Sequence, residues 1–550
     1  MSYDPSGRYS VGVCDVQYIE ESCSGTNGIA ADKHLVGRIF YPCNREITAT
    51  KAFKKASWLP SWEYARGYGA FLTGWGKPSL AKTLLRPVIT LSSYWLGHQA
   101  LADNFLGAPL VDSSEEHPVV LFSHGIGGTR TSYSGICTEL GSAGFVVLAL
   151  EHADGTAATV QLAGRAGHKF YSGWLSEEER LDQTRYRMRE LQTAYSLLAA
   201  MQAGKALQGM SLSNDLDASG FFAGRLAMGS ACLMGHSYGG ASVTALVAED
   251  ERFKCAIAYD PWWGALLPEQ AALEGWTTSS PLLVMGSHTW NTPNEKGQLF
   301  CGGERQEQVF ASAASAGAVH LVLEGSAHDT FNDIVQLVAL RYARVMHYLR
   351  MFKPHKRITE LHASLALPLV TKASLAFLKR HLALSAQQQA IIDESVAASS
   401  ARLESFESVL AKAEAKKQER QLQEDVKGQD KSLGMQAATA DQDSARAPGE
   451  SVSESEVEDA RSAAAAQFAG AEERALAASE SNSQDEAATA SLEHTLTARD
   501  PQSPEEQSMP EVCPGETYKQ DLKGRALQEK EQLEEVCRGH MHILTVHGFR

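Results

Sequence analysis

Short apolar runs recur along the first two thirds of the 550-residue chain, and Gly, Ser or charged residues follow most of them closely. Near-continuous apolar runs of this kind are typical of strands buried on both faces of a parallel sheet. A helical pattern lies among them from Glu177 to Met201, with apolar residues at helix-like spacing. The alternation predicts an α/β fold with a mostly parallel central sheet flanked by helices. The expected strands are 119–122, 145–150, 231–234, 255–259, 281–285 and 319–323.

The composition changes after about residue 385, where Ala, Glu, Gln, Ser and Lys replace most aromatic residues. Residues 391–550 hold 32 acids and 17 bases, so they account for almost the whole net charge of −16. A globally basic nucleic-acid-binding protein is therefore excluded as the default reading. The predicted divisions are an α/β domain over 1–385, a charged helical segment over 386–435, a disordered acidic linker over 436–515, and a tail over 516–550 with a short helix.

The cysteines and the N-terminus bear on the cellular location. The chain has 9 cysteines, an odd number, with no C-x-x-C pair, which is typical of reduced thiols. The first residues carry neither a basic region nor an apolar stretch typical of a signal peptide. The apolar runs also fall short of the roughly 20 residues that a spanning helix needs. We expect a cytoplasmic protein, with peripheral contact to membranes left open.

The sharpest local signal is the sequence Gly235-His236-Ser237-Tyr238-Gly239. An apolar run leads into it and small residues follow it, as in a nucleophile elbow, where a strained serine joins a strand to a helix. The alternative is an ordinary tight strand–helix turn with a buried serine. In this context the pattern predicts that Ser237 is a nucleophile.

An elbow serine needs an orienting acid and then a base later in the chain. Asp260 and His328 each follow an apolar run, and the carboxyl ends of parallel strands meet at one edge of a sheet. Asp260 and His328 are therefore the predicted acid and base. Among their rivals, Asp250 sits in a charged helix end, Asp329 and Asp333 directly follow the base, His320 lies inside a strand, and His288 remains the fallback base.

The developing oxyanion needs backbone N–H donors. One donor is expected from Tyr238, the residue after the nucleophile, and a second from the glycine-containing segment 123–128, which follows an early strand. That segment lacks the G-x-x-x-x-G-K-[ST] pattern of a phosphate-binding loop, so an NTPase is not expected.

Taken together, these segments resemble the platelet-activating factor acetylhydrolase family, the serine-dependent phospholipases of the group VII type. The resemblance covers roughly residues 5–370 in the family's order. The matching stretches include Tyr9-Ser10-Val11-Gly12, Arg38-Ile39-Phe40-Tyr41-Pro42, Trp58-Leu59-Pro60, Ser123-His124-Gly125, Glu151-His152 with Asp154, Gly235 to Gly240, Asp260 with Trp262, and Gly325-Ser326 with His328.

The resemblance implies an α/β-hydrolase fold in which Ser237 is the nucleophile, His328 the general base and Asp260 the orienting acid. It also implies that the amides of Ile126 and Tyr238 form the oxyanion hole. The implied substrates are phospholipids with a short or oxidised sn-2 acyl chain, cleaved without calcium or any other cofactor. No dense Asp cluster suited to calcium occurs in the sequence, which agrees with that expectation.

Departures from the family pattern leave the choice of substrate open. Pro261 stands where the family has a small residue, residues 288–306 resemble an insertion, and the acidic extension beyond 386 has no counterpart. A general short-chain carboxylesterase and a non-catalytic scaffold remain as alternatives. The aromatic segments 71–75, 94–97 and 105–106 either face a membrane or pack under the sheet, and 369–384 is either a basic amphipathic helix or the final core helix.

Overall fold

The computed structural model of the chain describes residues 4–405 with internal gaps, of which 21–32, 267–277 and 338–362 are the longest, together with residues 408 and 544–547. The predicted linker over 436–515 lies outside the described residues. So do most of the segment 386–435 and the predicted tail helix. The elements below belong to one compact unit.

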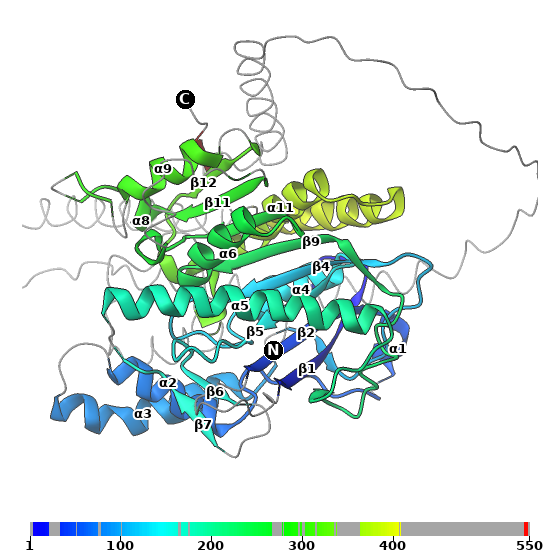
Figure 1. Cartoon of the computed structure of the whole chain (residues 1–550), viewed down its shortest axis with the longest axis horizontal. Helices are drawn as coiled ribbons and strands as arrows, with labels where there is room; N and C mark the ends of the chain where they lie inside the picture. Colours follow the sequence, from blue (N-terminus) through cyan, green and yellow to red (C-terminus); the bar gives the residue numbers. More distant parts are fainter. Residues whose placement is uncertain are drawn as a thin grey trace, which may run out of the picture. The chain divides into compact units, whose positions relative to one another are not determined.

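A large twisted sheet lies at the centre of this unit (Figure 1). Its order is β13-β12-β11-β10-β9-β4-β5-β2-β1-β3, with β8 pairing to β1. The pairs from β12 through β11, β10, β9 and β4 to β5 are parallel, whereas β13 and β2 join the two ends of this run antiparallel. The strands are β1 (Ser10–Glu20), β2 (Lys33–Cys43), β3 (Asn104–Leu106), β4 (His117–Ser123), β5 (Val146–Leu150), β8 (Met210–Leu212), β9 (Leu226–His236), β10 (Phe253–Tyr259), β11 (Leu282–Ser287), β12 (Val319–Leu323) and β13 (Leu544–His547). A separate small sheet pairs β6 (Thr159–Gln161) with β7 (His168–Phe170).

Helices cover both faces of the sheet, as Figure 1 shows. The helices are α1 (Arg45–Ala49), α2 (Trp62–Gly74), α3 (Leu80–Gly97), α4 (Ser134–Ser142), α5 (Glu177–Gln202), α6 (Tyr238–Glu249), α8 (His288–Asn291), α9 (Gly303–Ala313) and α11 (Ala363–His381), with 3-10 turns η1 (Trp263–Ala265) and η3 (His328–Phe331). α5 and α6 pack together over β4, β9 and β10, while α4 and α11 contact each other and the sheet. The predicted fold class, α/β with a mostly parallel sheet flanked by helices, is confirmed.

The predicted strands and the long helix appear where the pattern put them. β4 and β5 are buried along their whole length, as expected for strands covered on both faces. The pattern from Glu177 to Met201 corresponds to α5, which begins with a capping box between Ser176 and Glu179. The segment 369–384 lies largely within α11, whose apolar residues are buried, so it is a core helix rather than a basic amphipathic surface helix.

A further helix begins at residue 386, just past the predicted boundary at 385, and as far as residue 404 it belongs to the same unit. Ile391, Ile392 and Leu403 are buried. Lys379 of α11 also forms an ion pair with Asp393 at 2.5 Å. These contacts join the first turns of the predicted charged segment to the α/β domain.

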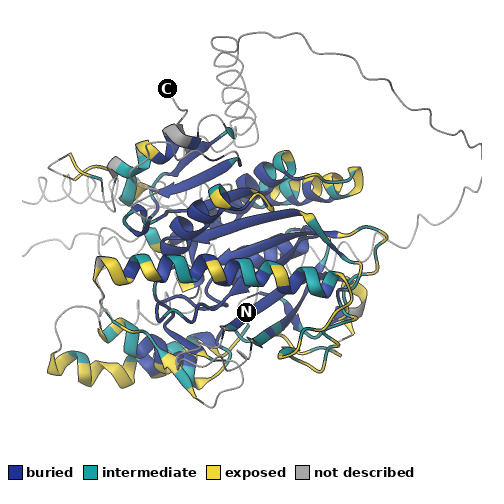
Figure 2. Cartoon of the chain, viewed as in Figure 1, coloured by how far each residue is buried: buried dark blue, intermediate teal, exposed yellow. Residues whose placement is uncertain are grey.

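α2 and α3 pack against each other at one margin of the unit, and Figure 2 shows α3 as mostly exposed. Large apolar side chains on α3 are exposed, among them Leu84, Val88, Leu91 and Trp95. Phe105, in contrast, is buried. Within the described residues, no helix is both long enough and apolar enough to cross a membrane.

Candidate active site

Ser237 lies at the sharp turn between β9 and α6, as the elbow pattern predicts. Its φ of 56° and ψ of −118° place a non-glycine residue in a strained region of backbone space. The flanking glycines make the turn sterically feasible. A Cβ at Gly239 would lie 2.1 Å from the Ser123 carbonyl oxygen, and one at Gly235 would lie 2.5 Å from the Gly239 carbonyl carbon. The sequence thus fixes Ser237 at the carboxyl end of the sheet.

Asp260 and His328 meet at the same sheet edge, Asp260 directly after β10 and His328 at the start of η3. The Nδ1 of His328 lies 2.7 Å from Oδ2 of Asp260. Asp260 is 2% exposed and also accepts hydrogen bonds from the amide and hydroxyl of Ser287 at 2.8 and 2.6 Å. Because Nδ1 faces a carboxylate, we assign its proton there, which leaves Nε2 of His328 able to accept a proton.

Backbone and ring contacts connect Ser237 to this pair. The Ser237 amide donates to the Tyr259 carbonyl at 2.9 Å, and the Trp262 amide donates to the Ser237 carbonyl at 2.9 Å. The ring of His236 lies 4.4 Å from that of His328, and its Nε2 donates to the His328 carbonyl at 3.0 Å. The structure gives no direct hydrogen bond between the Ser237 hydroxyl and His328. In sites without substrate, such catalytic bonds are often long.

The imidazole of His328 is covered by Trp290 from α8. The two rings stack with centroids 3.6 Å apart and planes 9° apart. Trp290 belongs to the segment 288–306, which the sequence marks as an insertion, and nothing in the sequence pointed to this contact. The stacked indole limits the rotation of His328 and shields one of its faces from water.

The loop after β4 brings backbone amides to the elbow. A Cβ on Gly125 would lie 3.0 Å from the Cβ of Ser237, which shows how closely the loop approaches. The neighbouring amides are engaged: Gly125 donates to the Tyr133 hydroxyl, Gly127 to the Thr156 carbonyl and Gly128 to the Gly125 carbonyl. Among the described residues, no group accepts from the Ile126 amide. Tyr238 is the first residue of α6, where helical N–H groups have no intrahelical partner. Both amides are therefore available to an oxyanion.

The rival residues are engaged elsewhere. His288 bonds Glu324 at 2.5 Å on the surface. His320 is buried within β12, and Asp250 pairs with Arg252 at 2.5 Å. Asp329 accepts from the Asn332 side chain at 2.8 Å, while Asp333 accepts from the Trp58 indole and the Gly135 amide, both at 3.0 Å.

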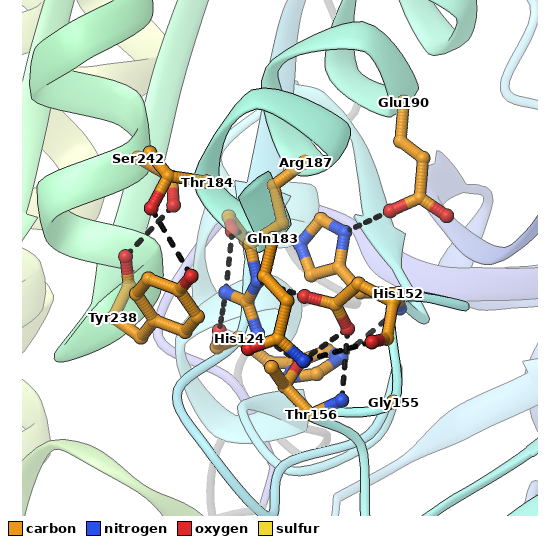
Figure 3. Close-up of polar contacts among 12 residues, drawn as sticks. His124, His152, Gly155, Thr156, Gln183, Thr184, Arg187, Glu190, Tyr238 and Ser242 are labelled. Atoms are coloured by element: carbon orange, nitrogen blue, oxygen red, sulfur yellow. Dashed lines mark hydrogen bonds and ion pairs between the residues drawn. The ribbon is translucent and has the colours of Figure 1, made fainter. Parts of the chain in front are cut away.

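A second serine–histidine–carboxylate chain, which the sequence reasoning missed, lies under the loop after β4. Ser123 Oγ is 2.8 Å from His152 Nε2, and His152 Nδ1 is 2.6 Å from Glu190 Oε2. Figure 3 shows the link between His152 and Glu190. Burial lowers the pKa of His152 well below its usual 6.5 and raises that of Glu190 well above 4.5. Ser123 and His152 are fully buried, so no substrate reaches this serine–histidine–carboxylate set.

The same region holds Arg187, another residue that sequence reasoning missed. A signal for it was present in the long helical pattern. One fully buried face of α5 carries polar residues at its start and apolar residues after them. An arginine on such a face is unusual, because a buried guanidinium needs several hydrogen-bonding partners. The residues of this face are Thr184, Arg187, Leu191, Ala194 and Leu198.

Comparison with known proteins gives the family. Residues 3–399 match the family model described as platelet-activating factor acetylhydrolase, isoform II. A platelet-activating factor acetylhydrolase of Canis lupus familiaris is 29% identical over 394 residues, covering 69% of this chain and 77% of that protein. A putative phospholipase A2 of Schizosaccharomyces pombe is 24% identical over 312 residues, covering 48% of this chain and 68% of that protein. A solved ferulic acid esterase from Streptomyces cinnamoneus, 18% identical, gives a TM-score of 0.47 over 71% of this chain and 98% of that one. The chain belongs to the platelet-activating factor acetylhydrolase isoform II family.

Proposed function

We propose that this protein is a calcium-independent serine esterase that cleaves the short or oxidised sn-2 acyl ester of phospholipids through an acyl-enzyme. The hydrogen bond between Asp260 and His328, beside the strained Ser237 turn, carries the proposal. Membership of the family and relatives named platelet-activating factor acetylhydrolase support the substrate class. A 2-acetyl alkyl glycerophosphocholine is therefore the expected substrate.

In this mechanism Ser237 Oγ attacks the ester carbonyl carbon while Nε2 of His328 takes the hydroxyl proton. Asp260 keeps the imidazole in the required tautomer and stabilises the imidazolium. The carbonyl oxygen becomes an oxyanion, which accepts hydrogen bonds from the amides of Ile126 and Tyr238. His328 then protonates the leaving lysophospholipid oxygen. Water, deprotonated by His328, finally releases the carboxylic acid and restores Ser237.

Hydrolysis assays in EDTA test the substrate class. They compare 1-alkyl-2-acetyl glycerophosphocholine, its 2-palmitoyl analogue and a simple alkyl acetate, with Ser237→Ala as background. We expect the acetyl phospholipid to be cleaved in preference to the palmitoyl one, with no loss in EDTA. Cleavage of the simple acetate alone, dependent on Ser237, would instead make the protein a general carboxylesterase. No turnover of any ester would favour the scaffold alternative.

The exposed face of α3 supports a second part of the proposal, contact with a lipid surface. Leu84, Val88, Leu91 and Trp95 form an apolar stripe at helical spacing and are 67%, 58%, 61% and 52% exposed. An exposed stripe of this kind on a helix suits burial at the boundary between headgroups and acyl chains. The expected cytoplasmic location of the enzyme stays a prediction.

Substitution on the stripe tests this contact. The double variant Leu84→Gln with Leu91→Gln should sediment less with phosphatidylcholine vesicles and cleave vesicle-embedded substrate more slowly. Hydrolysis of a water-soluble acetate should stay unchanged, because the site lies at the sheet edge rather than on α3. Unaltered vesicle binding in this variant would rule the stripe out as the membrane contact.

A further inference from the structure

The guanidinium of Arg187 lies fully buried between two loops and the helix that follows Ser237 (Figure 3). Its Nη1 donates to the His124 carbonyl at 2.5 Å, and its Nε donates to Oδ2 of Asp154 at 2.9 Å. Its Nη2 donates to the hydroxyl of Thr156 at 2.5 Å. One planar cation thus fixes groups from the loop after β4 and from the loop after β5.

These contacts hold both sides of the peptide that presents the Ile126 amide. On one side, Arg187 binds the carbonyl of His124, two residues before Ile126. On the other side, Gly127 donates its amide to the Thr156 carbonyl at 2.8 Å. Thr156 in turn is fixed by Arg187 and by Asp154, whose Oδ1 accepts from the Thr156 amide at 2.9 Å. The direction of the Ile126 N–H therefore depends on groups that Arg187 binds.

The second donor, Tyr238, touches the same cation. Cζ of Arg187 lies 4.3 Å from the centroid of the Tyr238 ring, within the range of a cation–π contact. The Tyr238 hydroxyl donates to the Arg180 carbonyl on α5 and accepts from Thr184 Oγ1, also on α5, at 3.1 Å. The ring is thus clamped against α5, which limits how the first turn of α6 can move.

We propose that Arg187 is the positioning residue of the oxyanion hole, because it sets both amide donors from one point. This inference rests on the proposed function. A purely structural role, neutralising Asp154, needs only a positive charge, which a lysine would supply. Holding the His124 carbonyl, Asp154 and Thr156 together needs the planar fork of an arginine.

Kinetics of Arg187→Met and Arg187→Lys test the proposal, with Arg180→Met as the matched control. Arg180 lies on the same helix and is also buried, and its side chain bonds Gln183 at 2.9 Å, Tyr171 at 3.2 Å and the Gly173 carbonyl at 3.1 Å. Its backbone carbonyl, which accepts from the Tyr238 hydroxyl, stays in place when the side chain is replaced. The readouts are kcat and KM for the 2-acetyl phospholipid and the inhibition constant of a trifluoromethyl ketone. Addition of Ser237 Oγ to that ketone forms a tetrahedral adduct whose oxyanion occupies the hole.

We expect Arg187→Met to lower kcat by about 10²-fold with KM within about threefold, the loss typical of a missing oxyanion donor. Affinity for the ketone should fall by the same factor as kcat/KM, because both depend on the oxyanion. Arg180→Met should keep kcat within about threefold of the wild type. Arg187→Lys should fold with near-normal stability yet lose about tenfold or more in kcat, so the test survives if Arg187→Met fails to fold.

Three results would overturn the proposal. They are a folded Arg187→Lys enzyme with wild-type kcat, a loss in Arg180→Met equal to that in Arg187→Met, and a raised KM with unchanged kcat. Failure of the proposed function looks different, because the wild type itself would then show no Ser237-dependent hydrolysis of the 2-acetyl phospholipid, whatever the Arg187 variants do.

Discussion

Two serine–histidine–carboxylate chains lie at neighbouring strand ends of this molecule, and only one has the surroundings of an active site. By hydrogen bonding alone the buried chain is the more complete, because Ser123 lies 2.8 Å from His152 Nε2. In the buried set, His152 Nδ1 lies 2.6 Å from Glu190 Oε2, and in the other set His328 Nδ1 lies 2.7 Å from Asp260 Oδ2. The differences are elsewhere. Ser237 sits on a strained turn beside unengaged amides, and the side chain of His328 is 24% exposed, whereas that of His152 is fully buried.

The comparison teaches that residue types and distances do not by themselves identify a catalytic site. A partly exposed histidine, a serine on a strained turn outside regular structure, and nearby amides with no acceptor among the described residues distinguish Ser237 from Ser123. The buried chain instead supports the loop that carries the Ile126 amide, since Ser123 ends β4 and His152 donates its amide to His124 Nε2 at 3.1 Å.

The largest predicted effects come from replacing the histidine of each set with alanine. His328→Ala should lower kcat about 10³-fold or more, with little change in the free energy of unfolding, because it removes the proposed base from a partly exposed position. His152→Ala should lower the free energy of unfolding by about 2–4 kcal/mol, because it leaves Ser123 and Glu190 buried without their partner. Its kcat, measured on folded protein, should fall less than about tenfold.

Steady-state assays and urea unfolding of both variants check this contrast. Equal losses of kcat in the two variants would break the comparison, since the buried chain would then take part in catalysis. A stable His152→Ala protein would also contradict the supporting role given to that chain.

The next effect concerns the strained turn that only Ser237 occupies. Gly235→Ala should lower the free energy of unfolding by about 2–4 kcal/mol and remove most of the esterase activity, because the new Cβ would lie 2.5 Å from the Gly239 backbone. Gly229→Ala, on the same strand β9, is the matched control, since nothing lies within 4 Å of a Cβ there. Thermal unfolding and hydrolysis assays check the pair. A Gly235→Ala enzyme as stable and active as Gly229→Ala would show that the close approach is dispensable.

The change with the smallest expected effect on activity concerns a buried acid near the site. Burial raises the pKa of Asp333 from 3.8 to about 7, although bonds from the Gly135 amide and the Trp58 indole oppose the rise. The pKa of Asp333 is higher in the folded state than in the unfolded state. The contribution of the Asp333 carboxyl to the free energy of unfolding is therefore complete below about pH 4 and is lost as the pH rises through 7. An asparagine at this position does not titrate. Between pH 4 and 8 the free energy of unfolding of the wild type should therefore fall by up to about 4 kcal/mol relative to that of Asp333→Asn.

Urea unfolding of the wild type and Asp333→Asn at several pH values measures this difference. A gap between the two proteins that stays constant from pH 4 to 8 would show that Asp333 is ionised throughout. The substitution should leave the bond between His328 and Asp260 intact, so ester hydrolysis by Asp333→Asn serves as the control for the site.

The strand-end residues were predictable because their signals are local. Ser237, Asp260 and His328 each follow an apolar run, and the topology of a parallel sheet brings such ends together. The residues that hold the site were not predictable in this way. Arg187 contacts His124 across 63 residues of sequence, and Trp290 covers His328 from a segment that sequence marks only as an insertion. Their roles depend on tertiary contacts that periodicity does not encode.

The peripheral elements illustrate the same limit. The sequence analysis predicts no helix over α3 and marks only residues 94–97 within it, as an aromatic segment that ends in glycine. Pro87 lies inside the helix and weakens the helical pattern. Its stripe of exposed apolar residues became visible once the helix was in place.

Active-site labelling tests the central claim most directly. The wild type, Ser237→Ala and Ser123→Ala are treated with a fluorophosphonate, which phosphonylates a nucleophilic serine, and the modified peptide is identified by mass spectrometry. We predict a single adduct on Ser237 in the wild type and in Ser123→Ala, none in Ser237→Ala, and loss of ester hydrolysis in step with labelling. An adduct on Ser123, or labelling and hydrolysis that persist in Ser237→Ala, would contradict the account.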